Sequence, residues 1–131
     1  MTYESGRRPL LTVIDDDQSV RESLPELLRE SGYEVETFES AEAFLASGEP
    51  GRAKCLIVDV AMPGMSGPEL QRELQRRGHS LPVIFITAKA DGTIRPRLLE
   101  QGAVDCLFKP FTERALLAAI GSALRVAGGE A

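Results

Sequence analysis

Acidic, hydroxyl and amine side chains follow several short apolar runs of this sequence, at the points where the runs end. They are Asp15, Asp16 and Asp17 after the first run, Asp59 at the end of the third, Thr87 at the end of the fourth and Lys109 after the fifth. In open α/β sheets, ligands bind at the carboxyl ends of the strands. If the runs form parallel strands, these side chains therefore gather at one end of a sheet.

The chemistry of this set is that of a hard divalent cation and a phosphoryl group. Close-set carboxylates repel one another and bind protons more tightly unless a cation lies between them. The expected ligands are all oxygens and are few in number. Such a set suits Mg²⁺, which keeps several waters and also binds phosphate oxygens, or Mn²⁺ as an alternative. His and Cys are absent from these loops, which argues against zinc or copper. Lys109 can neutralise phosphoryl charge, and the Thr87 hydroxyl can donate a hydrogen bond to it.

Helical patterns alternate with the apolar runs five times along the chain. The runs expected as strands are Leu10–Ile14, Val35–Phe38, Cys55–Val60, Val83–Thr87 and Cys106–Phe108. The helices are expected around Val20–Leu28, at Ala41–Ala46 after a Ser40 cap, around Leu70 and Leu74, at Ile94–Gln101, and around Leu116–Leu124. Pro25 should kink the first helix or restart it through a cap at Ser23. Five such units predict a parallel sheet with helices on both faces.

Length and composition fit one domain. The 131 residues leave little room for a second core. We expect the domain to cover residues 9–126, with a polar tail at 1–8 and a tail or the start of a linker at 127–131. The net charge of −5 argues against direct binding to a nucleic-acid backbone.

The chain carries no sign of export or membrane insertion. It has no apolar stretch of about 18 residues, and its N-terminus lacks the apolar segment of a signal peptide. Cys55 and Cys106 fall inside expected strands rather than in a disulfide framework. The fourth expected strand, Val83–Thr87, should lie between the strands of the two cysteines, so we expect no disulfide bridge between them. These features favour the cytoplasm.

Four motifs resemble the signature of response-regulator receiver domains. They are VIDDD at 13–17, DVAMPGMSG at 59–67, ITA at 86–88 and KPF at 109–111. The resemblance extends roughly from Leu10 to Leu124 and is greatest to FixJ-type receivers. It implies a CheY-like, flavodoxin-like three-layer (βα)5 sandwich with strand order 2-1-3-4-5.

The resemblance also implies a role for each polar residue. Asp59 would take a phosphoryl group from a phosphohistidine of a sensor histidine kinase or phosphotransfer protein. Asp16 would ligate Mg²⁺ directly and Asp15 through water. The remaining protein ligands would be Asp59 and the Ala61 backbone carbonyl. Thr87 and Lys109 would hold the phosphoryl oxygens, and the small Ala88 would leave room for them. Such a domain phosphorylates and slowly dephosphorylates its own aspartate and is not a turnover enzyme.

One residue departs from the family pattern at the expected switch. Receivers usually carry an aromatic residue or His three positions before the active-site lysine, and its ring turns inward on activation. This chain has Cys106 there. Thr87 should still move toward the phosphoryl group and reset the neighbouring surface. A thiol cannot fill the space of a ring, so a purely packing role is the plainer expectation for Cys106.

Other functions remain open from the sequence. A pseudo-receiver would dock to its partners without phosphorylation. A small haloacid-dehalogenase-type phosphohydrolase would use Asp15-x-Asp17 but would leave Asp59 unexplained. The output domain or partner is not in these residues, and the sequence does not decide between a stand-alone receiver and part of a longer regulator. Homodimer formation on phosphorylation is also left open.

Overall fold

A five-stranded parallel sheet forms the centre of the molecule. The computed structural model describes residues 8–88 and 92–127. The strands are β1 (Leu10–Ile14), β2 (Glu34–Phe38), β3 (Cys55–Asp59), β4 (Val83–Thr87) and β5 (Asp105–Phe108). Their order is β2-β1-β3-β4-β5, and every adjacent pair is parallel. The CheY-like fold and strand order implied by the sequence are confirmed.

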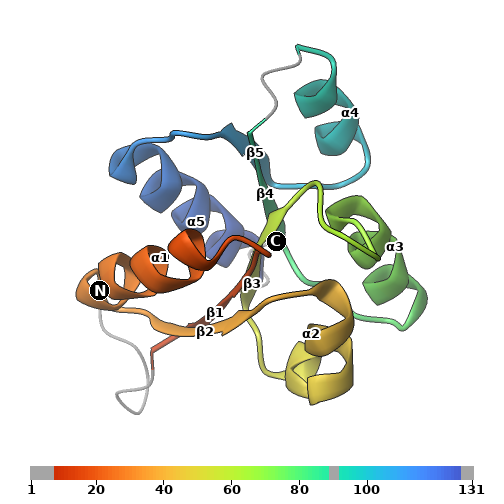
Figure 1. Cartoon of the computed structure of the whole chain (residues 1–131), viewed down its shortest axis with the longest axis horizontal. Helices are drawn as coiled ribbons and strands as arrows, with labels where there is room; N and C mark the ends of the chain where they lie inside the picture. The colour runs from red at the N-terminus through yellow and green to blue at the C-terminus, as the bar shows by residue number, and fades with distance from the viewer. Residues whose placement is uncertain (1–7, 89–91, 128–131) are drawn as a thin grey trace.

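Helices cover both faces of this sheet (Figure 1). They are α1 (Gln18–Glu30), α2 (Ala41–Ser47), the short 3₁₀ turn η2 (Glu49–Gly51), α3 (Gly67–Arg76), α4 (Ile94–Glu100) and α5 (Glu113–Ala127). One face packs against α1 and α5, and the other against α2, α3 and α4. All residues of β1, β3 and β4 are buried, as expected for strands covered on both faces. The three-layer arrangement leaves the strand ends as the place for a site.

The two cysteines lie on opposite faces of the sheet. Cys55 belongs to the apolar core under α1 and α5, and Cys106 belongs to the core under α2, α3 and α4. Both thiols are free and buried. The expectation that no bridge joins them is confirmed.

The first helix contradicts one expectation. It runs without interruption from Gln18 to Glu30, with Pro25 buried inside it. The Ser23 hydroxyl donates to the Ser19 carbonyl at 2.8 Å instead of capping a new helix. The restart at Ser23 was therefore the wrong alternative. The helix has one start, at Asp17, whose side chain caps it by accepting from the Ser19 amide.

Element ends differ from expectation by one residue in several places. The third strand ends at Asp59 rather than Val60, because the Val60 carbonyl turns to accept from the Gly67 amide at 3.0 Å. The expected tails lie outside the described residues except for Arg8 and Ala127, and Ala127 still belongs to α5. No helix in the described part of the chain is long and apolar enough to cross a membrane.

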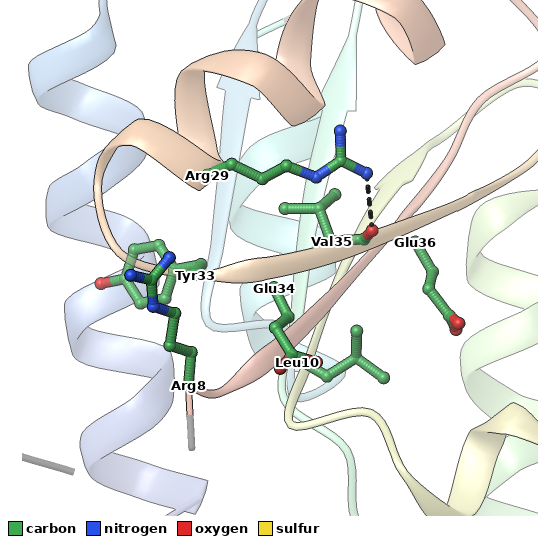
Figure 2. A pocket seen from close by; sticks show the side chains of 7 residues that line it. All are labelled: Arg8, Leu10, Arg29, Tyr33, Glu34, Val35 and Glu36. Carbon is green, nitrogen blue, oxygen red and sulfur yellow. Dashed lines mark hydrogen bonds between the residues drawn. The ribbon is translucent and has the colours of Figure 1, made fainter. Parts of the chain in front are cut away.

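The edge strand β2 is partly covered by a side chain from α1. Arg29 Nη2 donates to the Val35 carbonyl at 3.1 Å, as Figure 2 shows. This satisfies an outward-facing acceptor that could otherwise pair with another strand. Arg29 and Val35 line a hollow of about 340 Å³, and Leu10, the first residue of β1, lines it as well. It therefore lies at the opposite end of the sheet from Asp15, Asp16 and Asp59.

Candidate functional site

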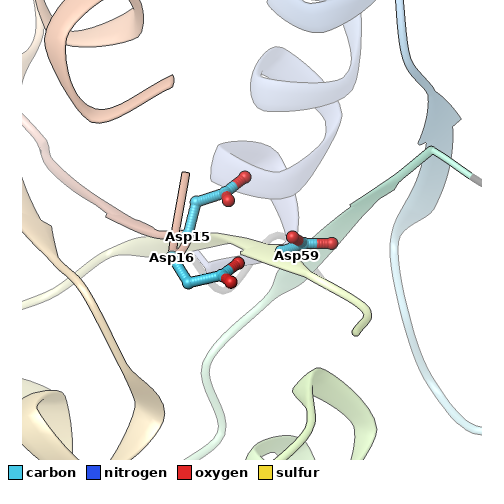
Figure 3. A group of neighbouring side chains, drawn as sticks. All are labelled: Asp15, Asp16 and Asp59. Carbon is cyan, nitrogen blue, oxygen red and sulfur yellow. The ribbon is translucent and has the colours of Figure 1, made fainter. Parts of the chain in front are cut away.

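Three carboxylates meet at the carboxyl ends of β1 and β3. One oxygen each from Asp15, Asp16 and Asp59 lies within 4.8 Å of the other two, and Figure 3 shows the side chains side by side. The cause is the strand register. Ile14 of β1 is level with Val58 of β3, so the residues that follow them are neighbours. The cluster expected from the sequence is thus present.

The members of the cluster differ in exposure and in the contacts they already make. Asp15 is fully buried, and both of its oxygens have protein partners. Its Oδ1 accepts from the Asp17 amide at 2.9 Å, and its Oδ2 accepts from Lys109 Nζ at 3.1 Å. Asp16 is exposed. This asymmetry leaves Asp16 better able than Asp15 to offer an oxygen to an ion.

Asp59 is 8% exposed at the end of β3. Burial, followed by the neighbouring charge of Asp15, raises the pKa of Asp59 to about 6. Lys109 and the Ala61 amide oppose this shift. Lys109 Nζ is 3.8 Å from Asp59 Oδ2, and the Ala61 amide donates to Asp59 Oδ1 at 3.3 Å. A cation beside Asp59 would favour its ionised form.

Lys109 reaches the carboxylates from the loop after β5. Its backbone amide donates to the Thr87 carbonyl at 2.8 Å, which places the two residues side by side. Burial by itself lowers the pKa of Lys109, but the hydrogen bond to Asp15 and the nearby negative charges outweigh it and raise this pKa. The ammonium therefore stays charged. The peptide bond between Lys109 and Pro110 is cis.

The remaining expected residues lie at the same end of the sheet. Thr87 is the last residue of β4 and is 2% exposed, and Ala88 follows it at the surface. Ala61 is also exposed, two residues after Asp59. The ends of four strands, β1, β3, β4 and β5, or the loops after them therefore supply the expected residues, and β2 supplies none.

The donor set fits Mg²⁺. All three clustered side chains offer hard carboxylate oxygens, and a partly exposed arrangement leaves room for the waters that this ion retains. Among the described residues this cluster includes no thiol or imidazole. The chemistry of the ligands thus matches the ion expected from the sequence.

Gly67 is required by close packing under the acceptor. A Cβ atom there would lie 2.5 Å from the Asp59 carbonyl oxygen and 2.9 Å from the Phe85 ring. Gly67 begins α3, and the N-terminus of this helix is capped by a reciprocal pair of hydrogen bonds between Ser66 and Glu69. The helix start can approach the strand end only because position 67 has no side chain.

Two supporting residues were not found by sequence reasoning. Arg21 Nη1 donates to the Asp15 carbonyl at 2.9 Å, and Glu42 Oε2 accepts from the Met65 amide at 2.8 Å. Both contacts join a helix side chain to a backbone group of a loop. Such contacts follow no fixed spacing, so no motif could have indicated them.

Cys106 occupies the expected switch position as a small buried side chain. It is 1% exposed, and burial is the main cause that raises the pKa of its thiol. The neighbouring Asp105 accepts from Arg95 of α4 at 2.8 Å. A neutral thiol packed in this way matches the packing role expected for it.

Comparison with known proteins agrees with this geometry. Residues 11–121 match the family of response regulator receiver domains. The response regulator protein TodT of Pseudomonas putida is 41% identical over 127 residues, which cover 97% of this chain and 56% of TodT. The transcriptional regulatory protein FixJ of Azorhizobium caulinodans is 46% identical over 112 residues, covering 86% and 53% of the two chains. This chain thus spans about half the length of the curated relatives it matches.

Comparison with solved structures agrees with the sequence matches. The crystal structure of FixJ-N superposes with a TM-score of 0.81 at 35% identity, covering 91% of this chain and 95% of that one. The phosphohydrolase alternative is overturned by the family match, and Asp17, on which it relied, serves as the cap of α1. Fold, carboxylate cluster and sequence match agree that the chain belongs to the response regulator receiver domains of two-component systems.

Proposed function

We propose that Asp59 accepts a phosphoryl group from a phosphohistidine of a partner histidine kinase or phosphotransfer protein. The observation that carries this proposal is the meeting of Asp15, Asp16 and Asp59 with the Lys109 ammonium from a distant loop. The three carboxylates carry more negative charge than Lys109 can neutralise, which favours the binding of a second cation. The Lys109 ammonium can in turn bind an incoming anion.

The transfer step needs an ionised Asp59. One Oδ atom attacks phosphorus, and the phosphorus–nitrogen bond of the phosphohistidine breaks as the new phosphorus–oxygen bond forms. The electron pair of the broken bond stays on the imidazole nitrogen. The products are an acyl phosphate on Asp59 and a histidine free to be phosphorylated again. The protein contributes mainly position and charge.

Asp16, Asp59 and the Ala61 carbonyl would hold Mg²⁺ directly, with Asp15 acting through a water. The different surroundings of Asp15 and Asp16 support this division, since both Asp15 oxygens already accept hydrogen bonds. When bound, the ion neutralises negative charge on the carboxylates and on the phosphoryl oxygens.

Lys109, Thr87 and Ala88 would receive the transferred group. Lys109 keeps its positive charge beside Asp59, and Thr87 lies next to Lys109 at the end of β4. The methyl side chain of Ala88 leaves space at the surface. Thr87 moving toward a phosphoryl oxygen would shift the start of the β4–α4 connection, which is the proposed switch.

The partners follow from the same site. A kinase or phosphotransfer protein supplies the phosphoryl group, and an output partner responds to the switch. FixJ is a transcriptional regulatory protein and is about twice as long as the matched region. We propose that this receiver likewise controls an output domain, and that phosphorylation promotes its self-association. Because Cys106 replaces a ring, the output signal would depend on Thr87 and on the movement of α4.

Labelling with acetyl phosphate tests the proposed function. The intact protein in Mg²⁺ should gain about 80 Da, read by mass spectrometry, and peptide mapping should place the label on Asp59. Asp59→Asn should abolish the label, whereas Glu100→Gln, a charge change on exposed α4, should retain it. Absence of label in the wild-type protein, with kinase-borne phosphohistidine as well, would instead support the pseudo-receiver.

A further inference from the structure

The loop that follows the phosphoacceptor is held by a carboxylate from another part of the chain. Glu42 lies in the first turn of α2, which Ser40 caps. Its Oε2 accepts from the Met65 amide at 2.8 Å, across 23 positions of sequence. Met65 belongs to the connection between β3 and α3, five residues after Val60. The bond therefore joins α2 to the loop that carries Ala61.

The approach of this loop to Glu42 is close. Gly64 has a φ of +76°, and a Cβ atom there would lie 2.5 Å from Glu42 Oε2. A positive φ already favours glycine. The Glu42 carboxylate thus lies beside Gly64 as well as the Met65 amide, although as the end of a flexible side chain it adds little steric restriction of its own.

Neighbouring amides of the loop are held at the same time. The Ser66 amide donates to Glu69 Oε1 at 2.8 Å, and the Gly67 amide donates to the Val60 carbonyl at 3.0 Å. Three consecutive amides, of Met65, Ser66 and Gly67, thus have acceptors. Glu69 and Val60 belong to the loop and its own helix. Glu42 is the acceptor that comes from elsewhere in the fold, and it relates the loop to the sheet through α2.

We propose that Glu42 is a positioning residue for the metal site, acting through the Met65 amide to hold the Val60–Ser66 loop and hence the Ala61 carbonyl. This inference rests on the proposed function, because it concerns the loop oxygen expected to ligate Mg²⁺. Glu42 need not touch the ion or the phosphoryl group. Without it, the loop would reach the same arrangement less often, and Mg²⁺ would bind more weakly.

The test compares Glu42→Ala with Glu42→Gln in the intact protein. Rates of labelling by acetyl phosphate are measured over a range of Mg²⁺ concentrations. Glu42→Ala should raise the half-saturating Mg²⁺ concentration about three- to tenfold, with a smaller change in the rate at saturation. Glu42→Gln keeps an oxygen acceptor and should restore most of the affinity. Equal half-saturation in wild-type protein and Glu42→Ala would overturn the inference.

Two further measurements separate positioning from general stability and from the proposed function. Hydrogen exchange of the Met65 amide should be faster in Glu42→Ala and close to wild type in Glu42→Gln, with or without Mg²⁺. Gly64→Ala should weaken Mg²⁺ binding in the wild-type background and do so less beside Glu42→Ala, where the steric conflict is gone. Equal penalties in both backgrounds count against the contact. If the wild-type protein takes no label while the exchange result holds, the proposed function fails and the loop contact stands.

Discussion

Lys109 Nζ donates a 3.1 Å hydrogen bond to Asp15 Oδ2 across 94 positions of sequence. The carboxylate is fully buried, whereas 23% of the lysine side chain is exposed. The pair joins the first and last strand ends of the site and brings Nζ to 3.8 Å from Asp59. Lys109 therefore has a structural role as well as the proposed role in binding phosphoryl oxygens.

We expect Lys109→Met to lower the free energy of unfolding by about 1–3 kcal/mol, because it leaves the buried Asp15 charge without its cation. Urea unfolding at neutral pH measures the change. In the Asp15→Asn background the same substitution should cost clearly less, since no charge remains to be compensated. Additive effects of the two substitutions would contradict the coupling. Asp59 of the Lys109→Met variant should also be labelled more slowly, even under conditions where the variant is fully folded.

Asp59 should destabilise the metal-free protein at neutral pH. Its pKa is about 6 when folded, above the ordinary value of 3.8, so the folded protein keeps the proton longer than the unfolded chain. This carboxyl favours folding most below pH 4, and that contribution is lost as pH rises to 6. Asp59→Asn does not titrate. In a chelator, its stability advantage over wild type should therefore grow by roughly 1–3 kcal/mol between pH 4 and 7.

The measurement is urea unfolding of both proteins across that pH range. Glu100→Gln, which changes an exposed carboxyl of α4 outside the cluster, is the control for general effects of charge removal. An advantage of Asp59→Asn that stays constant with pH would mean that the acceptor carboxyl is not perturbed.

Mg²⁺ should stabilise the wild-type protein through the same cluster. At a Mg²⁺ concentration ten times the dissociation constant, the gain is about 1.4 kcal/mol by mass action. The apparent affinity should fall as pH drops through 6, because a protonated Asp59 is a poor ligand. Thermal unfolding with and without chelator provides the readout. Asp16→Asn and Asp59→Asn should each lose most of the stabilisation by Mg²⁺. The same measurement with Ca²⁺ tells whether the site is specific for small ions.

Much of this arrangement could be predicted because the residues concerned obey periodic rules. Buried strands read as apolar runs, and the order of Asp15, Asp59, Thr87 and Lys109 along the chain matched one family motif after another. The parallel register then required Asp15 and Asp59 to be neighbours. For these residues, local pattern and tertiary position agree.

The residues that escaped prediction depend on contacts between distant segments. Glu42 and Arg21 look like ordinary charged residues on helix surfaces, and only the folded chain brings them to backbone groups of loops. Pro25 was misjudged for a related reason. Local patterns allowed either a kink or a new start with a cap at Ser23, but α1 continues through Pro25, which is buried inside it, so the new start was wrong. Tertiary packing outweighed the local preference.

Gly67 offers a final test of how tightly the acceptor strand and α3 are packed. Gly67→Ala places a methyl group 2.5 Å from the Asp59 carbonyl and 2.9 Å from the Phe85 ring, both of which are fixed by the sheet. We expect it to lower the free energy of unfolding by about 1–3 kcal/mol and to slow Asp59 labelling. Gly121→Ala is the matched control, because its nearest neighbour is the flexible end of Arg125 at 3.7 Å. In the middle of α5 this change should stabilise by about 0.5–1 kcal/mol. Urea unfolding of the two variants decides the matter: if both are stabilised to a similar extent, the strand end and helix start are looser than the structure implies.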